Sequence, residues 1–265
     1  MSRVRRGIFI LPSVLTTASL FCGFYSIISS IKGDYNAAAI SILIAVFFDA
    51  MDGKVARVTR TVSSFGVEYD SLSDLVAFGV APGVLAFNWV LSPFGRMGWL
   101  ASFLFVACGA LRLARFNVQI GLMDSRFFNG LPIPGAAGMV AATALLFGGM
   151  GIHIGNFPMP YYIGLLIMIY VLSFLMVSNI KFTSFKDMEP IKLKPFRALV
   201  VAVLFLVVVA SEPHLIIFIL FASYVISGPS FAALRFIRKR KKTILEPDAS
   251  VARGTLSESP KKNKI

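Results

Sequence analysis

The sequence predicts an all-α polytopic membrane protein, built as a bundle of about six to eight transmembrane helices. Composition is the first observation: 57% of the 265 residues are hydrophobic and 15% are charged, which is far less charge than a soluble domain of this size carries. The second is the recurrence of apolar runs long enough to cross about 30 Å of hydrocarbon. The third is the placement of lysine and arginine, which orients membrane helices.

Eight apolar runs can be placed along the chain. They cover residues 9–31, 37–57, 67–90, 98–118, 133–150, 159–178, 196–211 and 213–236. The seventh run is short and meets the eighth at Glu212 and Pro213, so the span count is left between six and eight. Three arginines precede the first run but no small-residue cleavage site follows it. We therefore interpret the first run as a retained span and not as a signal peptide.

Basic residues orient this bundle. With eight spans and both termini in the cytoplasm, only Lys32 and Arg96 of the 26 lysines and arginines fall in outside loops. Because cytoplasmic loops are enriched in lysine and arginine, this threading is favoured over its mirror image.

The chain turns polar after the last run. We expect residues 1–237 to form the transmembrane domain and residues 238–265 to be a disordered cytoplasmic tail. Residues 235–265 carry ten basic and three acidic residues, which supply +7 of the net charge of +13. Two functions of this basic tail stay open: attraction to anionic lipid, and a signal that sets the membrane topology. Nucleic-acid binding is not expected, because no aromatic residue follows Phe236.

Cysteine and histidine offer little chemistry here. Cys22 and Cys108 both fall within predicted spans, and two cysteines are too few for a disulfide framework or a metal cluster. We interpret them as packing residues. His153 and His214 are assigned to the outer side.

Carboxylates concentrate at the cytoplasmic ends of the second and third spans. The second span carries Asp49 and Asp52 near its end, and the third carries Asp70 and Asp74 in its first two turns. Spacings of three and four residues put each pair on one helical face. Four carboxylates in a low-dielectric setting repel one another unless cations lie between them, and oxygen ligands suit Mg²⁺ or Mn²⁺. The sequence therefore predicts a site for two such ions.

Small residues clear the faces around these acids. Gly53 directly follows Asp52, and Ala56 lies one helical turn beyond it. Gly66 lies one turn before Asp70. An interior glycine costs a helix about 1 kcal/mol, which is reasonable where a bulky ligand must approach closely. Arg57 lies at the entrance to the predicted metal site, where a guanidinium is suited to bind phosphate oxygens. These features together predict a diphosphate site.

An ion-coupled transporter is the alternative from another class, because intramembrane carboxylates also relay protons or Na⁺. Transporter sites usually lie near the bilayer midplane, whereas these acids lie toward the cytoplasmic interface. The interfacial position favours an enzyme.

Written as a pattern, the stretch is Asp49-x2-Asp52-Gly53-x2-Ala56-Arg57-x8-Gly66-x3-Asp70-x3-Asp74. All eight fixed positions resemble the signature of the CDP-alcohol phosphotransferases. The resemblance implies a membrane-embedded helical enzyme, usually dimeric, with a divalent-metal site open to the cytoplasm. Such enzymes transfer a substituted phosphoryl group from a CDP-linked donor to an alcohol and release CMP.

The resemblance also assigns roles to residues of this chain. The implied metal ligands are Asp49, Asp52, Asp70 and Asp74. The last of these is also the implied general base on the acceptor hydroxyl. The implied CDP and diphosphate contacts are Asp52, Gly53, Ala56, Arg57 and Gly66. Metal is the only cofactor implied.

Residues 11–24, 109–118, 127–138 and 184–187 resemble segments of the bacterial phosphatidylserine synthases of this family. Ser13 and Ser19 depart from that branch, which carries asparagines there. The resemblance implies CDP-diacylglycerol and L-serine as substrates, membrane lipids as surroundings, and the bacterial inner membrane as location. Glycerol phosphate, inositol phosphate and choline stay open as acceptors, and so does a non-catalytic relative.

The candidate acceptor residues are Arg112, Arg115, Asn117 and Lys186. All four fall on the same side as the carboxylates in the threading above. Two arginines three residues apart, with an asparagine nearby, can bind the carboxylate of serine. Two other interpretations stay open for the arginines: they anchor the helix end by snorkelling, or they bind the phosphate of a phosphorylated acceptor. For Lys186, the alternative is a solvated ion pair with the neighbouring Asp187.

Overall fold

The computed structural model describes residues 3–59, 63–119, 127–150, 158–183 and 211–245 of the chain. Residues 1–228 form one compact unit and residues 229–265 a second. The packing described below is that of the first unit.

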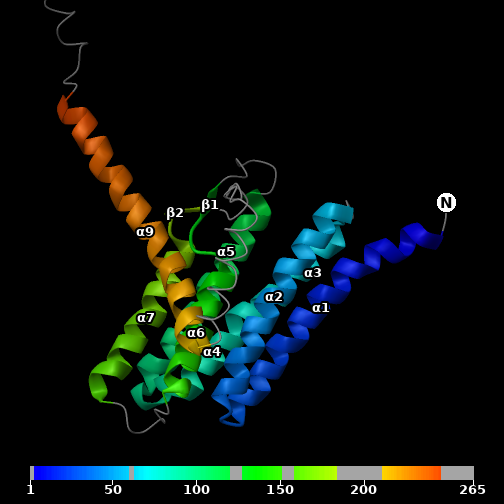
Figure 1. Cartoon of the computed structure of the whole chain (residues 1–265), viewed down its shortest axis with the longest axis horizontal. Coiled ribbons are helices and arrows are strands. Elements are labelled where there is room, and N and C mark those ends of the chain that lie inside the picture. The colour runs from blue at the N-terminus through cyan, green and yellow to red at the C-terminus, as the bar shows by residue number, and fades with distance from the viewer. Residues whose placement is uncertain (1–2, 60–62, 120–126, 151–157, 184–210, 246–265) are drawn as a thin grey trace, which may run out of the picture. The chain divides into compact units, whose positions relative to one another are not determined.

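The first unit is a helical bundle (Figure 1). The α-helices are α1 (Arg3–Ile31), α2 (Tyr35–Thr59), α3 (Ser64–Asp74), α4 (Ala81–Ala86), α5 (Arg96–Gln119), α6 (Ile133–Gly149), α7 (Met159–Val177) and α9 (Pro213–Leu245), the last of which continues into the second unit. Two π-helical segments, η1 (Leu75–Val80) and η2 (Phe87–Leu91), and a 3₁₀ turn, η3 (Ser92–Phe94), complete the path between α3 and α5. Two short strands, β1 (Phe127–Asn129) and β2 (Lys181–Thr183), pair antiparallel.

The predicted all-α polytopic fold is confirmed. Within the described ranges, five helical stretches are long and apolar enough to cross a membrane: Pro12–Ile31, Ser64–Phe94, Arg96–Val118, Met159–Val177 and Pro213–Ala232. The shorter apolar helix α6 joins them, and α2 lies alongside α1 and also packs against α6 (Figure 1). Apart from Ser211, the predicted seventh span lies outside the described residues.

Helix α9 is longer than the predicted eighth span. It ends at Leu245 and so includes residues 238–245, which we expected to begin a disordered tail. Lysine and arginine are good helix formers and are favourable near a helix C-terminus, so a run of basic residues can prolong a helix without any apolar periodicity. Residues 246–265 lie outside the described part of the chain, where disorder stays a prediction.

The third span is irregular directly after its last aspartate. Helix α3 ends at Asp74, and the π-helical η1 follows without a break. Pro82, just beyond η1, has no backbone N–H, so the carbonyl of residue 78 loses its ordinary α-helical partner and the chain widens there. Widened turns of this kind are frequent at functional sites. The uniform helix predicted over residues 67–90 missed this feature.

Small residues bring α1 close to η1. A Cβ atom on the buried Gly23 of α1 would lie 2.5 Å from the Cα of Ala77, so only glycine permits this approach. Small residues allow such close backbone contact between membrane helices. The contact holds α1 against the third span, one turn beyond the aspartates of α3.

The short β ladder fixes the start of α6. Gly130, which follows β1, has φ +84° and donates a backbone hydrogen bond to Ile180 (2.8 Å). Leu131 then bonds to the carbonyl of Leu175 on α7 (2.9 Å). These bonds tie the segment before α6 to the C-terminal end of α7.

Candidate metal and phosphate site

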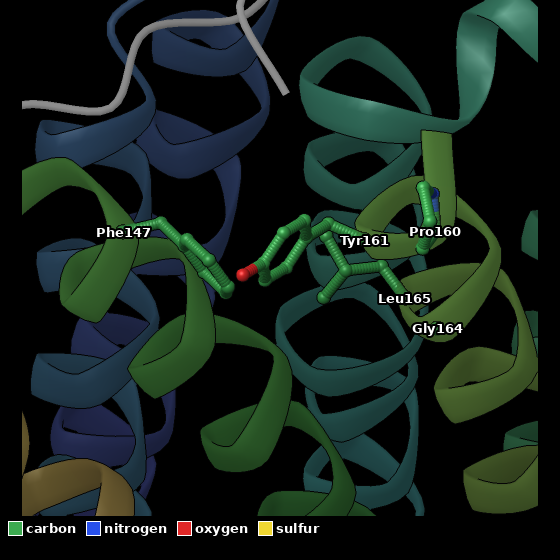
Figure 2. A pocket seen from close by; sticks show the side chains of 5 residues that line it. All are labelled: Phe147, Pro160, Tyr161, Gly164 and Leu165. Carbon is green, nitrogen blue, oxygen red and sulfur yellow. The ribbon is translucent and has the colours of Figure 1, made fainter. Parts of the chain in front are cut away.

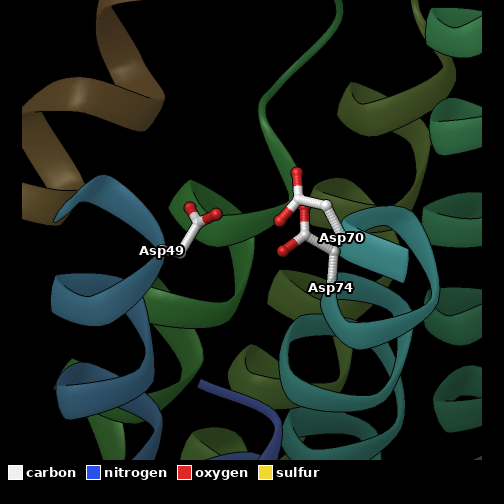
Figure 3. Close-up of side chains that lie close together, drawn as sticks. All are labelled: Asp49, Asp70 and Asp74. Carbon is white, nitrogen blue, oxygen red and sulfur yellow. The ribbon is translucent and has the colours of Figure 1, made fainter. Parts of the chain in front are cut away.

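Three carboxylates converge between α2 and α3. One oxygen atom each of Asp49, Asp70 and Asp74 lies within 4.8 Å of the others, and the side chains point into one shared space (Figure 3). The first comes from the second half of α2, and the other two lie one turn apart on α3. Three carboxylates at this separation could hold a divalent cation with oxygen ligands.

Asp52 lies beside this triad with a different set of partners. Its side chain is buried, 6% exposed, and the carboxylate lies within hydrogen-bonding reach of Asp70. Its Oδ2 also accepts a 2.7 Å hydrogen bond from the hydroxyl of Thr16 on α1. The predicted four-carboxylate cluster is thus present as a triad at ligand spacing with a fourth acid next to it.

Helix α1 links the two acid-bearing helices through hydrogen bonds that sequence analysis missed. Thr16 bonds to Asp52 of α2 through its hydroxyl, and its carbonyl accepts a 3.1 Å bond from the hydroxyl of Ser73 on α3. The next residue, Thr17, shares a 2.9 Å hydrogen bond with Tyr69. The available signal was a buried polar side chain in an apolar span, because such a group needs a partner.

The two serines that depart from the expected asparagines also lie on α1. Ser19 is buried and its hydroxyl donates to the carbonyl of Ala45 (3.2 Å). The carbonyl of Ser13 accepts a 2.7 Å bond from Thr17. The side chain of Ser19 therefore joins α1 to α2, whereas the bond at Ser13 uses the backbone carbonyl alone.

The first turn of α3 leaves space in front of its acids. Ser63 caps the helix, and its hydroxyl accepts a 3.0 Å hydrogen bond from the backbone N–H of Gly66. A Cβ on this glycine would meet only that serine oxygen, at 3.1 Å. The face one turn before Asp70 is therefore open.

Other candidate phosphate ligands lie at the end of α2. Gly53 is half-buried directly after the second aspartate. The backbone of α2 also includes Ala56 and Arg57, but their side chains lie outside what the structure describes, so their predicted roles stay predictions.

Of the three candidate acceptor residues that the structure describes, Arg112 is the one whose charge interacts with Asp74. It is half-buried on α5, and its Nε atom is buried without a hydrogen-bond partner among the described residues. Among the described side chains, the one positive charge of Arg112 leaves the four carboxylates with excess negative charge, which favours divalent cations as the remaining counter-charge.

The other candidates are placed differently. Arg115 donates to the side-chain oxygen of Asn179 (2.7 Å) and to the carbonyl of Val177 (3.5 Å), so it braces the end of α7. Asn117 donates a 2.9 Å hydrogen bond to Ser71, which joins α5 to α3. Lys186 lies outside the described residues.

An apolar groove is formed by side chains of α1 and α2. It has a volume of about 630 Å³ and is lined by Val14, Thr17, Ala18, Phe21, Cys22 and Phe48. Its lining includes the neighbours in sequence of Asp49 and Thr16. The groove is therefore formed by α1 together with one aromatic side chain of α2.

A second cavity, of about 310 Å³, lies between α6 and α7 (Figure 2). Its lining is Phe147, Pro160, Tyr161, Gly164 and Leu165. The adjacent Gly148 packs against Asn36 at the start of α2, thirteen residues before Asp49, or about 20 Å along a helix axis. This cavity is at the opposite end of the bundle from the carboxylates.

Comparison with known proteins agrees with the geometry. The family model of the CDP-alcohol phosphatidyltransferases matches residues 9–176. A CDP-diacylglycerol–serine O-phosphatidyltransferase from Helicobacter pylori is 40% identical over 182 residues, covering 69% of this chain and 75% of that protein. The proteins of the same name from Bacillus subtilis (36% identical; 66% of this chain, 91% of that protein) and Mycobacterium tuberculosis (32% identical; 86% and 80%) are also similar.

The matched region includes most of α1 and all of α2 and α3, and with them the carboxylate triad and the acid beside it. The several apolar helices make the protein an integral membrane protein. On its sequence match and its site, the chain belongs to the CDP-alcohol phosphatidyltransferase family.

Proposed function

We propose that this protein transfers the phosphatidyl group of CDP-diacylglycerol to the hydroxyl of L-serine and produces phosphatidylserine and CMP. The observation that carries the proposal is the convergence of Asp49, Asp70 and Asp74 within the family region. The names of the relatives from Helicobacter pylori and Bacillus subtilis favour serine as the acceptor over glycerol phosphate, inositol phosphate or choline.

The carboxylates fit divalent metal ions. We expect the triad and Asp52 to hold two Mg²⁺ or Mn²⁺ ions, because an all-oxygen ligand set with no cysteine or histidine suits these hard cations. When bound, the ions supply positive charge that stabilises the phosphoryl oxygens and the departing CMP.

The chain's own residues supply the proton transfer. The serine hydroxyl oxygen forms a bond to the phosphorus that carries diacylglycerol. The bond from that phosphorus to the oxygen bridging to CMP breaks, and CMP leaves with this oxygen. The hydroxyl proton passes to the carboxylate of Asp74, because an alcohol is a poor nucleophile at neutral pH without a base.

The donor has a polar and an apolar part, and the site offers surfaces for both. We assign the CDP group to Asp52, Gly53, Ala56, Arg57 and Gly66, with the arginine on the diphosphate. The apolar groove beside Phe48 suits an acyl chain that stays in the bilayer while the CDP group reaches the carboxylates.

For the acceptor, we assign the carboxylate of serine to Arg112, whose charge interacts with Asp74. Arg115 and Asn117 are proposed to hold α5 in place through α7 and α3. Lys186 is kept as a predicted acceptor contact.

The proposal includes an orientation and an assembly. We expect the bacterial inner membrane, with the site and both termini on the cytoplasmic side, a transmembrane domain of residues 1–237 and a basic tail of residues 238–265. A homodimer is expected from the family resemblance. Light scattering of the detergent-solubilised protein measures the assembly, and accessibility of single cysteines introduced near residues 66 and 96 measures the orientation.

The central experiment is CMP release by the purified protein from CDP-diacylglycerol with Mn²⁺ or Mg²⁺, with and without L-serine, and with the lipid product identified by mass. Serine-dependent CMP release with a phosphatidylserine product supports the proposal. Release with another alcohol alone would overturn the serine assignment and keep the metal site. No release with any alcohol would overturn the enzymatic proposal.

A further inference from the structure

We propose that the hydrogen bond between Ser71 of α3 and Asn117 of α5 aligns the acceptor with the donor for the transfer step. Both residues are positioning residues in this inference, because they act through the helices that they join. The inference deepens the proposed function and rests on it. In place of the predicted acceptor contact, it gives Asn117 a part in bringing the acceptor hydroxyl next to Asp74.

One set of helices, α1, α2 and α3, carries the carboxylates and is called the donor helices below. Helix α1 packs against both of the others, and the three lie side by side (Figure 1). Thr16 bonds to Asp52 on α2 through its hydroxyl and to Ser73 on α3 through its carbonyl, and Thr17 shares a hydrogen bond with Tyr69. These bonds hold the carboxylates in place from the side of α1.

A second set, α5 and α7, carries the arginine that we assign to the carboxylate of serine, and is called the acceptor helices. These two helices pack against each other. Arg115 donates hydrogen bonds to the carbonyl of Val177 and to the side chain of Asn179, at and just beyond the end of α7. Arg112 lies three residues before Arg115 on the same helix, so the position of its backbone follows α5 and α7.

The two sets of helices meet on either side of Asp74 along the chain. Directly after this residue comes the π-helical η1, on which α5 packs closely, whereas among the described residues α5 is much less closely packed on α3 itself. One helical turn before it, Ser71 accepts a 2.9 Å hydrogen bond from the side-chain amide of Asn117. Because α3 and α5 are not closely packed, this hydrogen bond is well placed to fix the distance between them.

The amide of Asn117 turns both of its polar ends to α3. Its Nδ2 donates to Oγ of Ser71, and the single proton of the serine hydroxyl can go to Oδ1 of Asn117 (3.3 Å) or to the carbonyl of Val67 (3.0 Å). Both side chains of the pair are half-buried. An amide that has its donor and its acceptor directed at one serine is better suited to joining helices than to binding the acceptor.

The transfer step depends on how the two sets of helices are aligned. The donor helices carry the acids and the assigned CDP contacts, whereas the acceptor helices carry the arginine assigned to serine. Displacement of reacting atoms by about 1 Å can lower a rate by roughly a hundredfold. Loss of the hydrogen bond frees the two sets to shift against each other, so it should lower kcat. The binding of metal and lipid depends on the donor helices and should be preserved.

The test measures CMP release by the purified full-length protein against the concentrations of L-serine, CDP-diacylglycerol and Mn²⁺. For Asn117→Ala and for Ser71→Ala we expect kcat to fall about ten- to hundredfold, with the KM for the lipid and the Mn²⁺ requirement unchanged. The double variant should fall no further than either single variant, because the two side chains act as one pair. Ser71→Thr, which keeps the hydroxyl, should retain most of the wild-type kcat.

Two control variants match the groups that are removed. Ser223→Ala removes an exposed hydroxyl that bonds within α9 to the carbonyl of Leu220. Asn36→Ala removes an exposed amide in the first turn of α2. Both controls should have the kcat of wild type.

Several results would overturn the inference. An unchanged kcat in Asn117→Ala and Ser71→Ala is the first. A rise in the Mn²⁺ requirement equal to the fall in kcat is the second, because it indicates a general loss of the metal site. Additive losses in the double variant, or a kcat of Ser71→Thr as low as that of Ser71→Ala, would also overturn it, because the hydrogen bond would then not be the cause. Absence of serine-dependent CMP release in wild type would instead overturn the proposed function.

Discussion

The hydroxyl of Thr16 donates a 2.7 Å hydrogen bond to the carboxylate of Asp52, across the interface between α1 and α2. Both residues are buried. The bond orients the acid that lies next to the metal-binding triad, and the carbonyl of the same threonine holds Ser73 on α3. One residue of the first helix therefore forms hydrogen bonds with both acid-bearing helices.

Thr16→Val should weaken metal binding while preserving the shape of the side chain. Hydrogen bonds to charged groups contribute about 1.5–3 kcal/mol, and loss of such a partner lowers metal affinity by roughly 10–100-fold. We expect the Mn²⁺ concentration for half-maximal CMP release to rise about tenfold. Ser26→Ala is the matched control, because the buried hydroxyl of Ser26 has no hydrogen-bond partner among the described residues. An unchanged Mn²⁺ requirement in Thr16→Val would contradict this role.

Asp70→Asn should abolish turnover and change how metal affects stability. Removal of one charge relieves repulsion among neighbouring carboxylates, so the melting temperature in EDTA should rise. The stabilisation by Mn²⁺, about 2.7 kcal/mol at a hundredfold excess over Kd, should largely disappear. Thermal unfolding in detergent with EDTA and with Mn²⁺ measures both effects. Glu68→Gln, an exposed change on the same helix, should behave as wild type, and a full Mn²⁺ response in Asp70→Asn would contradict the metal site.

Asp74→Asn should abolish CMP release and leave measurable binding of the CDP-lipid. The amide cannot accept the acceptor's proton, whereas the contacts of the donor with the other acids remain. Calorimetry in detergent, which measures the binding of CDP-diacylglycerol to the inactive variant, checks the prediction. Full activity would remove Asp74 from the role of base.

The two arginines of α5 should respond differently to the same substitution. Arg112→Lys replaces a forked donor by a point charge, so the KM for serine should rise about tenfold or more. Arg115→Lys should mainly lower the melting temperature, because that guanidinium braces the end of α7. Steady-state kinetics and thermal unfolding of both variants separate the two roles. Equal effects on the serine KM would contradict this assignment.

Gly23→Ala should destabilise the bundle near the acids. The added methyl group would lie 2.5 Å from the Cα of Ala77, and overpacking of this kind costs about 1–3 kcal/mol. Gly164→Ala, at an exposed position of α7 with open space around it, should be neutral or stabilising by up to about 1 kcal/mol. Thermal unfolding of the pair in one detergent makes the comparison. If Gly23→Ala has the melting temperature of wild type, α1 and η1 can move apart without loss of stability, which would contradict this prediction.

Much of this architecture could be predicted from the sequence because the signals are local. Apolar length fixes a membrane helix within a few residues, as for α6 and α7, whose observed bounds lie within one residue of the predicted spans. Spacing of three and four residues fixes which acids share a helical face, which is why the convergence of Asp49, Asp70 and Asp74 could be anticipated.

What could not be predicted depends on contacts between distant residues. Thr16 has the appearance of any polar residue in an apolar span until α2 is packed beside it. The basic pair on α5 reads as one motif, yet its members turn to different neighbours, Asp74 for Arg112 and Asn179 for Arg115. Tyr224 lies on a helix outside the signature, and only the packing of α9 on α6 places its ring over Gly135.

The fit of Tyr224 over Gly135 has an evolutionary consequence. A ring and an absent side chain form a complementary pair, so neither position can change freely alone. Where a related enzyme carries alanine or a larger residue at the position of Gly135, its partner on the last helix should be smaller or absent. Paired substitution at these two positions would then mark the lineages in which the last helix packs against α6 in this way.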